Sequence, residues 1–168
     1  MNIEIRILQE SDIPLISNSF TFQGWNKPEE IYSAYFADQQ RGERTVLLVF
    51  LENQFAGYLT VIWNSDYSYL SYKNIPIISD LNVLIKFQKQ GLATKLLDYS
   101  EDVVAKRSKI IGIGVGLTQD YGRAQRLYVK RGYIPDGKGI NQNGIFPSYG
   151  DKIIIDDALI LCLIKELN

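Results

Sequence analysis

The sequence predicts an α/β (α+β) fold with a mixed central sheet and helices on both of its faces. Strand-like and helical segments follow one another in the order β-α-α-β-β-β-α-β-α-β-β along 168 residues. Strands joined by short turns pair antiparallel, whereas strands joined through a helix pair parallel. Because the order contains both kinds of connection, we expect a mixed sheet.

The N-terminal part predicts one strand and two helices. Residues 2–8 alternate isoleucine with polar residues, which is typical of a half-buried strand. Ser11 and Asp12 offer an N-cap for the first helix. Pro28, followed by two glutamates that suit the positive end of a helix dipole, opens the second helix, and Gly42 ends it.

Three strands are expected next. The apolar residues 45–51 and 55–63 flank the turn residues 52–54, which predicts a β-hairpin. Residues 64–74 are polar and rich in tyrosine, as in a loop. Residues 75–85 form another apolar strand pattern.

The C-terminal part alternates helices and strands. Two apolar stripes predict an amphipathic helix at 91–107, and a second helix is expected at 120–131. Between them, residues 109–117 alternate apolar residues with glycine, so that one face of this strand is bare and admits a packed helix or a slender ligand.

The last segments complete the sheet. Tyr133 and Ile134 begin a strand, residues 136–151 are predicted as a long loop because they are rich in glycine and asparagine, and residues 158–164 form a final apolar strand. Since we find no linker or repeat, residues 1–168 are interpreted as one domain.

The composition excludes several classes of function. The net charge is −1 and histidine is absent. Without a basic stripe, nucleic acid is not expected as a partner. Without histidine, Ser-His-Asp and Cys-His nucleophile systems cannot form and the commonest zinc ligand is missing, so no metal site is expected. The single cysteine, Cys162, stands in an apolar run and is expected to pack in the core.

The sequence also bears on location. Residues 1–8 carry charges, unlike the apolar centre of a signal peptide. No apolar run approaches about 18 residues, so no membrane partner is expected. A lone cysteine forms no intrachain disulfide, which fits a reducing compartment. We therefore predict a cytoplasmic protein.

The most informative segment joins the strand at 75–85 to the helix at 91–107. It contains residues 88–93, QKQGLA. Backbone N–H groups at a helix start lack intrahelical acceptors, and the helix dipole adds partial positive charge there. Gly91 lets the backbone approach a ligand closely. The segment therefore predicts a cradle for an anion such as a phosphate.

A second motif lies on the helix at 120–131. Its residues are Ala124, Leu127, Tyr128, Gly132 and Tyr133. Tyr121, Ala124 and Tyr128 share one face of the helix. Because a phenol with a pKa near 10 can give a proton to a thiolate of similar basicity, Tyr128 is a candidate general acid. The alternative is a core tyrosine that packs on the sheet.

The two motifs resemble those of the GNAT family of acyl-CoA-dependent N-acetyltransferases, Gln/Arg-x-x-Gly-x-Gly/Ala and Ala-x-x-Leu/Phe-Tyr-x-x-x-Gly-Phe/Tyr. The resemblance covers nearly the whole chain in element order and spacing. It implies the GNAT fold, with a mostly antiparallel sheet that splays between strands 75–85 and 109–117. It also implies acetyl-CoA as cosubstrate and no metal.

The resemblance implies a set of cofactor-binding residues. The backbone of one strand would pair with the amide arm of pantetheine as an added strand would. The coenzyme A pyrophosphate would lie against backbone amides at the helix start, and one helix face would border the pantetheine. These residues are Asn82, Val83, Leu84, Gln88, Lys89, Gln90, Gly91, Leu92, Ala93, Thr94, Tyr121 and Ala124. Gln88 stands where the family often has arginine, and Tyr121 where many relatives have asparagine.

The resemblance also implies catalytic roles. Tyr128 would protonate the leaving thiolate, and a backbone N–H near Val83 and Leu84 would polarise the thioester carbonyl. Several family enzymes carry a glutamate as general base where this chain has Ile77. Asp80 is the nearest carboxylate on the strand and would act through water. Alternatively, the amine arrives neutral after losing its proton to bulk water.

A further set of residues is expected to surround the acceptor amine. Trp25, Tyr67, Tyr69, Tyr72 and the segment 136–151 are expected to border the acceptor pocket. The acceptor itself would be a small-molecule or protein amine. Homodimers are common in the family, although no segment of this sequence demands one.

The function that we predict from the sequence is acetyl transfer from acetyl-CoA to a primary amine (EC 2.3.1.-), by direct attack and without a covalent intermediate. The alternative is a non-catalytic acyl-CoA-binding or sensor domain, which Ile77 favours and Tyr128 disfavours. A nucleotide-binding module that uses Gly112–Gly116 is disfavoured, because Leu117 occupies the place of the third glycine in the dinucleotide fingerprint.

Overall fold

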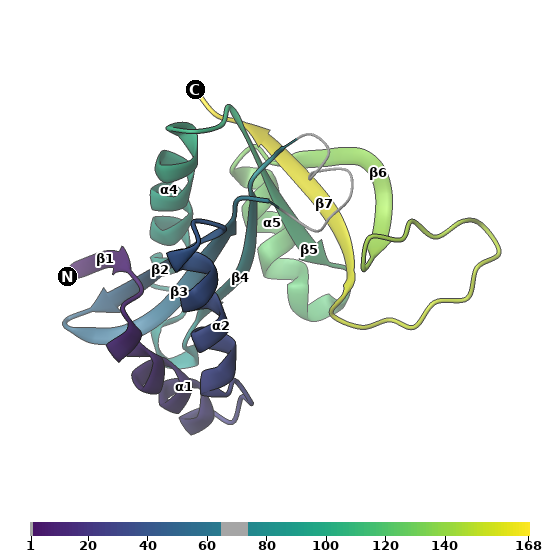
Figure 1. Ribbon diagram of the computed structural model, residues 1–168. Coiled ribbons are helices and arrows are strands. Elements are labelled where there is room, and N and C mark those ends of the chain that lie inside the picture. Colours follow the sequence, from purple (N-terminus) through teal and green to yellow (C-terminus); the bar gives the residue numbers. More distant parts are fainter. Residues whose placement is uncertain (1, 65–73) are drawn as a thin grey trace. The chain divides into compact units, whose positions relative to one another are not determined.

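The computed structural model describes residues 2–64 and 74–168 (Figure 1). These residues form two compact units, one within Met1–Trp63 and Ile78–Val103 and the other within Asn64–Ile77 and Val104–Asn168. The described residues carry seven strands together with helices. The strand pairs β1–β2, β2–β3, β5–β7 and β6–β7 are antiparallel. The predicted fold class is thereby confirmed. The one-domain assignment and the splay between two of the strands stay predictions.

The first unit holds four strands in the order β1-β2-β3-β4. Its elements are β1 (Ile3–Ile7), a 3₁₀ turn (Glu10–Asp12), α1 (Ile13–Phe22), α2 (Glu29–Gln40), β2 (Arg44–Leu51), β3 (Gln54–Ile62), β4 (Ile77–Val83), a 3₁₀ turn (Ile85–Phe87) and α4 (Leu92–Ala105), with the outer residues of β4 and α4 assigned to the second unit. The expected hairpin is confirmed: β2 and β3 pair antiparallel. Glu52 and Asn53 both have positive φ, as the tight hairpin turns require.

The core of this unit lies where α1 and α2 pack against β2 and β3. Phe20 and Tyr32 each meet the ring of Tyr58 edge to face, with centroids 5.6 and 5.5 Å apart. All three side chains are fully buried. Residues Val46–Leu51 of β2 are buried in succession. A strand that is covered on both faces needs such a continuous apolar run instead of alternation.

The second unit holds three strands in the order β5-β7-β6. Its elements are β5 (Ile110–Gly116), a 3₁₀ turn (Gln119–Tyr121), α5 (Gly122–Lys130), β6 (Ile134–Gln142) and β7 (Leu159–Glu166). The prediction of a loop over 136–151 was wrong for its first part, because β6 extends to Gln142. The pairing with β7 shifts register between Pro135 and Ile140. Both glycines there, Gly137 and Gly139, have positive φ and belong to this bulged part of β6 and not to a loop.

The bare face of β5 is occupied by protein at two glycines. A Cβ on Gly116 would lie 2.4 Å from the ring of Tyr121, and a Cβ on Gly114 would lie 2.8 Å from Cδ1 of Ile160. The sequence allowed a packed helix or a slender ligand; at these two positions the space is filled by a side chain of the 3₁₀ turn before α5 and by one of β7.

Candidate functional site

The segment that the sequence predicts as an anion cradle lies at the start of α4. Lys89 and Gly91 have φ of +62° and +80°, so the chain turns sharply before the helix begins at Leu92. The N–H of Lys95 donates to the carbonyl of Gly91 at 3.0 Å, which is the first bond of the helix. The N–H groups of Leu92, Ala93 and Thr94 precede that bond and lack intrahelical acceptors. A Cβ on Gly91 would have no atom within 4 Å, so the backbone there borders open space.

Two glutamine side chains brace this turn. The amide of Gln88 donates to the carbonyl of Val83 at 3.1 Å, and that of Gln90 donates to the carbonyl of Lys86 at 3.4 Å. Among the residues that the structure describes, the exposed Lys89 has no ion-pair partner. Lys89 is therefore the cation of the cradle that a ligand can engage, while Gln88 holds the turn to β4.

The end of β4 is fixed along one edge. The N–H of Leu84 donates to the carbonyl of Ala56 on β3 at 2.8 Å. A Cβ on Gly57 would lie 2.3 Å from the carbonyl oxygen of Asn82, so only glycine allows the two strands this close approach. Successive N–H groups of a strand alternate between its edges, which directs the N–H of Val83 away from β3. Of the two polarising donors that the sequence indicated, Leu84 is already engaged.

Asp80 lies at the centre of a polar cluster that we call the Asp80 cluster (Lys27, Tyr35, Tyr58, Asp80 and Asn82). Oδ1 of Asp80 accepts hydrogen bonds from Lys27 Nζ at 3.1 Å and from Asn82 Nδ2 at 2.6 Å. Oδ2 accepts from the hydroxyl of Tyr35 at 2.9 Å and from that of Tyr58. The residue has φ of +53° inside β4, a left-handed conformation that re-aims its side chain.

These contacts decide the charge of Asp80. Burial by itself raises the pKa of the carboxyl, but the Lys27 ammonium and the hydrogen bonds from Tyr58, Lys27 and Tyr35 together hold it below its ordinary value. Burial, followed by the nearby Asp80 charge, raises the pKa of both Tyr58 and Tyr35, which therefore stay protonated as donors. A carboxylate with a lowered pKa and four hydrogen bonds is a weak proton acceptor at neutral pH. The base role of Asp80 stays a prediction, and this geometry weighs against it.

Sequence reasoning did not identify three members of this cluster. Lys27, Tyr35 and Tyr58 come from the segment before α2, from α2 and from β3. Periodicity marks the two tyrosines only as core residues. The one available signal was Asp80 itself, because a carboxylate in an apolar strand requires polar partners.

Tyr128, in the second unit, has a different environment from that of Asp80. It lies on α5, is 6% exposed, and packs against Tyr133 with ring centroids 6.2 Å apart. Burial, followed by the charge of Tyr121, raises the pKa of Tyr128 to about 12. Within the described part of the chain, its hydroxyl has no hydrogen-bond partner. Tyr128 is therefore a protonated donor whose hydroxyl has no acceptor among the residues that the structure describes.

Tyr121 and Ala124 lie on the same segment. The ring of Tyr121 packs on Gly116, and its hydroxyl donates to Asp157 at 3.3 Å. Ala124 is partly exposed on α5, one residue before Gln125, whose amide donates to the carbonyl of Gly116 at 2.8 Å. These contacts fix α5 to the end of β5 and so fix the position of Tyr128 within this unit. The predicted contacts of Tyr121 and Ala124 with the cofactor stay predictions.

The residues expected around the acceptor pocket are only partly described. Tyr67, Tyr69 and Tyr72 lie outside the described residues. Trp25 is 37% exposed and stacks on Phe20 at 5.8 Å. The connection from β6 to β7 borders a pocket of about 350 Å³, lined by Gln142, Asn143, Ile145, Pro147, Asp151, Lys152 and Ile153. Part of the predicted segment therefore does line a pocket, in the second unit.

Residues 2–64 and 74–168 contain no group of histidine, cysteine, aspartate or glutamate side chains that could hold a metal ion. No helix among them is long and apolar enough to span a membrane. Ile77, at the position where several GNAT enzymes have a glutamate, is 7% exposed and belongs to the apolar core.

Comparison with known structures supports the fold. An N-acetyltransferase from Staphylococcus aureus Mu50 is 16% identical, with a TM-score of 0.72 and full coverage of both chains. The protein yncA from Salmonella typhimurium, solved with acetyl-CoA, is 15% identical with a TM-score of 0.71, covering 100% of this chain and 95% of the other. RimL, a ribosomal L7/L12 alpha-N-protein acetyltransferase solved with coenzyme A, is 15% identical with a TM-score of 0.73, covering 99% and 95%.

The comparison of sequences identifies the family. No curated protein sequence is similar enough to count as a match. The sequence model of the acetyltransferase (GNAT) family, however, matches residues 12–133, which include β4, the cradle and the helix that carries Tyr128. The chain therefore belongs to the GNAT family of acetyltransferases.

Proposed function

We propose that this protein transfers the acetyl group of acetyl-CoA to a primary amine by direct attack, without a covalent intermediate. The observation that carries the proposal is the cradle at the start of α4, within the stretch that the GNAT family matches. Family membership supports an acyltransferase that uses acetyl-CoA. The acceptor and the assignment of steps to residues are parts of the proposal.

The residues present fit the cosubstrate. A pyrophosphate needs converging N–H donors and positive charge, and the helix start with Lys89 provides both. The backbone amides that would hold it are those of Gln90, Gly91, Leu92, Ala93 and Thr94. The open space beside Gly91 supports this placement. The amide arm of pantetheine would pair with the edge of β4 that the N–H of Val83 faces.

The chemistry requires two groups of the protein. The N–H of Val83 would polarise the thioester carbonyl as the amine attacks it. A C–N bond then forms and the C–S bond breaks; Tyr128 would give its proton to the thiolate and would be reprotonated by the proton that the nitrogen loses as it becomes an amide. Burial raises the pKa of the Tyr128 hydroxyl. Burial would also raise the pKa of a coenzyme A thiol in the same surroundings, so a proton can still pass from Tyr128 to the thiolate.

Direct attack agrees with the state of the single thiol. Cys162 is fully buried in β7, and burial, followed by the charge of Asp136, raises its pKa to about 12. A thiol in this state is not a nucleophile at neutral pH. A ping-pong reaction through an acetyl-cysteine at this position is therefore disfavoured.

The amine must lose a proton, and two routes are compatible with the sequence. Asp80 could accept it through water, or bulk water could remove it before the amine binds. The Asp80 cluster favours bulk water, because the carboxylate is engaged by four donors and its pKa is lowered. On this route, turnover rises with pH towards the pKa of the acceptor itself.

The test is thiol release from acetyl-CoA in the presence of an amine panel. The panel contains polyamines, aminoglycosides, lysine peptides, and peptides with N-terminal serine or alanine. The peptides are included because structural neighbours are described as acetylating the N-terminal serine of L7/L12 and as a ribosomal-protein-alanine N-acetyltransferase. Amine-dependent thiol release supports the proposal. Tight acetyl-CoA binding without release on any member of the panel contradicts it.

A second candidate is an acyl-CoA-binding or sensor domain without turnover. The observation in its favour is that the buried Ile77 stands where a base is common, while the nearest carboxylate is engaged in its own cluster. Hydrogen exchange measures binding in both cases. If acetyl-CoA does not protect the amides of Gly91–Thr94, the cradle is not its site.

A further inference from the structure

One side of α5 carries three cations, which we call the α5 face (Arg123, Arg126 and Lys130). Their spacing places them within about 60° of one another around the helix axis. All three residues are exposed. Tyr128 is buried and lies about 140° around the axis from Arg123. The α5 face is therefore separate from the residue that we propose as general acid.

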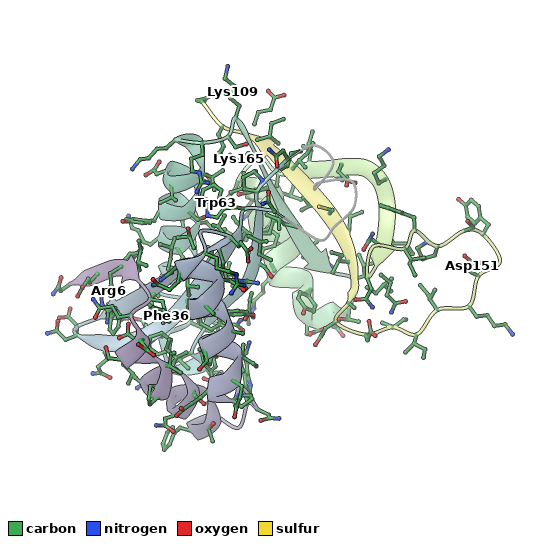
Figure 2. All side chains as sticks on the ribbon, in the orientation of Figure 1. Arg6, Phe36, Trp63, Lys109, Asp151 and Lys165 are labelled. Atoms are coloured by element: carbon green, nitrogen blue, oxygen red, sulfur yellow. The ribbon has the colours of Figure 1, made fainter. Side chains whose placement is uncertain are left out.

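The three side chains of the α5 face have no partner among the residues that the structure describes. Arg123, Arg126 and Lys130 form neither an ion pair nor a side-chain hydrogen bond there. The arginines that do have partners are Arg6, Arg41, Arg44, Arg107 and Arg131. Arg6, for example, which is labelled in Figure 2, donates to both carboxylate oxygens of Asp12 at 2.7 Å. The two arginines without a partner thus both belong to the α5 face.

Within the helix these cations repel one another. Arg123 and Arg126 stand three residues apart, and Arg126 and Lys130 stand four apart. Side chains at these spacings are neighbours on a helix, and like charges there destabilise it. The carboxylate of Asp120, three residues before Arg123, accepts from the hydroxyl of Thr118 and forms no ion pair with Arg123. Carboxylates of a partner would turn the repulsion into attraction.

The net charge of −1 is divided unequally between the two units. The second unit has eleven lysines and arginines against seven aspartates and glutamates, a net charge of +4, whereas the first unit has seven against twelve, a net charge of −5. The positive unit attracts a segment of opposite charge. The overall charge, from which no basic stripe was expected, therefore conceals the α5 face.

The surroundings of the α5 face favour a peptide over a nucleic acid. Val129, next to Lys130, is 62% exposed and offers an apolar contact that a phosphate backbone does not use. Tight binding to nucleic acid requires many phosphate contacts, whereas the α5 face extends only about 10 Å along the helix and Asp120 stands just before it. An extended peptide of about four residues spans this length. Arginine is also enriched in interfaces between proteins.

We propose that the α5 face binds an acidic segment of a protein partner. Carboxylates at alternate positions of an extended segment lie about 7 Å apart on one side of it, which matches the spacing of the three cations. Arginine holds a carboxylate through two parallel hydrogen bonds, so Arg123 and Arg126 are suited to this role. Because the pairs are exposed, the affinity is expected to fall as the salt concentration rises.

The experiment is fluorescence anisotropy of a labelled peptide titrated with the full chain. The peptide has about nine residues, which span the face. It alternates glutamate with serine and is acetylated at its N-terminus, so that it contains no amine to be acetylated. We expect it to bind. A peptide with the same label and with glutamine in place of glutamate should bind about tenfold more weakly or less, because it lacks the charges.

Substitutions test the position of the site. Arg126→Glu reverses the charge in the middle of the α5 face and should weaken binding of the acidic peptide about tenfold or more. Arg126→Lys keeps the charge and should cost less than about threefold. Lys106→Glu is the matched control, because it makes an equal or smaller change of charge at an exposed lysine of the same unit, and affinity should stay within about twofold. Circular dichroism checks that each variant is folded.

Four results would overturn this proposal. They are no binding of the acidic peptide below about 1 mM, equal losses from Arg126→Glu and Lys106→Glu, tighter binding of a thymidine oligonucleotide of equal charge than of the peptide, and displacement of the peptide by acetyl-CoA. The third would assign the α5 face to nucleic acid and the fourth to the phosphates of the cofactor. None of them depends on thiol release, so failure here is distinct from failure of the proposed function.

Discussion

The Asp80 cluster in the first unit and Tyr128 in the second are both buried polar groups, and they differ in what their own chain provides. Asp80 accepts four hydrogen bonds and is ionised, with a lowered pKa. Tyr128 has no hydrogen-bond partner among the described residues and is neutral, with its pKa raised to about 12. A group that is fully satisfied internally has little capacity left for a substrate, whereas a donor without an acceptor can still give its proton.

The same contrast separates two lysines. Lys27 is paired with Asp80 and contacts the hydroxyl of Tyr58 at 3.0 Å, whereas Lys89 is exposed beside the cradle, without an ion pair among the described residues. Lys27 therefore supports the fold, whereas Lys89 is open to a ligand. Substitutions at four positions test this difference between satisfied and open groups.

The largest expected effect comes from Tyr128→Phe. If the hydroxyl gives a proton to the thiolate, turnover should fall by about two orders of magnitude or more, the scale of general acid catalysis. The dissociation constant of acetyl-CoA should change by less than about threefold, because the ring is kept. Thiol release and calorimetry measure the two quantities.

The control for Tyr128 is Tyr133→Phe, which removes the hydroxyl of the buried neighbouring tyrosine. Turnover within about threefold of the unchanged protein is expected for it. Equal losses in the two variants would mean that the Tyr128 hydroxyl has no special role.

The next effect is on stability. Asp80→Asn removes the ion pair and leaves the Lys27 ammonium unpaired, which should lower the free energy of unfolding at pH 7 by about 3 kcal/mol. Since the folded pKa of Asp80 is lowered, its contribution is present above the unfolded value of about 3.9 and is lost as the pH falls through the folded value. Urea unfolding at several pH values should therefore show a smaller acid-induced loss for the variant than for the unchanged protein.

The same variant tests the base role. If Asp80 only supports the structure, the dependence of kcat/KM on pH keeps its shape and turnover stays within about tenfold. A loss of two orders of magnitude together with a flattened acid limb would make Asp80 the base. Asp12, whose pKa is also lowered, by hydrogen bonds from Arg6 and Gln9 that outweigh the effect of burial, keeps some acid sensitivity in the variant.

A smaller effect is expected at Gly91, where the cradle is open. Gly91→Ala places a methyl group where nothing lies within 4 Å, at φ of +80°. Strain should destabilise the fold by about 1 kcal/mol, and the methyl group should obstruct the pyrophosphate, weakening acetyl-CoA binding about tenfold or more. That fold-change corresponds to roughly 1.4 kcal/mol.

Gly42→Ala is the matched control for Gly91→Ala. Gly42 has φ of +75° after α2, and a Cβ there also meets nothing within 4 Å. It should show the same loss of stability with normal acetyl-CoA affinity. Equal affinities for the two variants would exclude the cradle as the phosphate site.

The smallest effect is expected from Lys89→Gln. An exposed cation adds about 0.2–1 kcal/mol to binding of an anion, so affinity for acetyl-CoA should fall up to about fivefold, with less effect at high salt. Lys106→Gln removes the same charge just beyond the opposite end of α4 and should leave affinity unchanged. If the two variants behave alike, Lys89 contributes only to the general charge.

The order of strands and helices could be predicted from the sequence, because alternation, apolar runs and helix caps each depend only on neighbouring residues. The hairpin of β2 and β3 was predicted from its turn for that reason. The extent of β6 was not, because glycines in a bulge have the composition of a loop and only pairing with β7 distinguishes them. The cradle and Tyr128 were located from spacing, whereas three partners of Asp80 were not, since they come from separate elements.

The family, the segment proposed as an anion cradle, the tyrosine on a helix at family spacing and the lack of a histidine-based mechanism could all be read from the sequence alone. These features depend on residue type and short spacing. The contacts of Asp80 with Lys27, Tyr35 and Tyr58, and the lack of such partners for Tyr128 among the described residues, could be seen only in the folded chain. The pKa and reactivity of a buried group depend on which distant residues surround it, and folding brings those residues together.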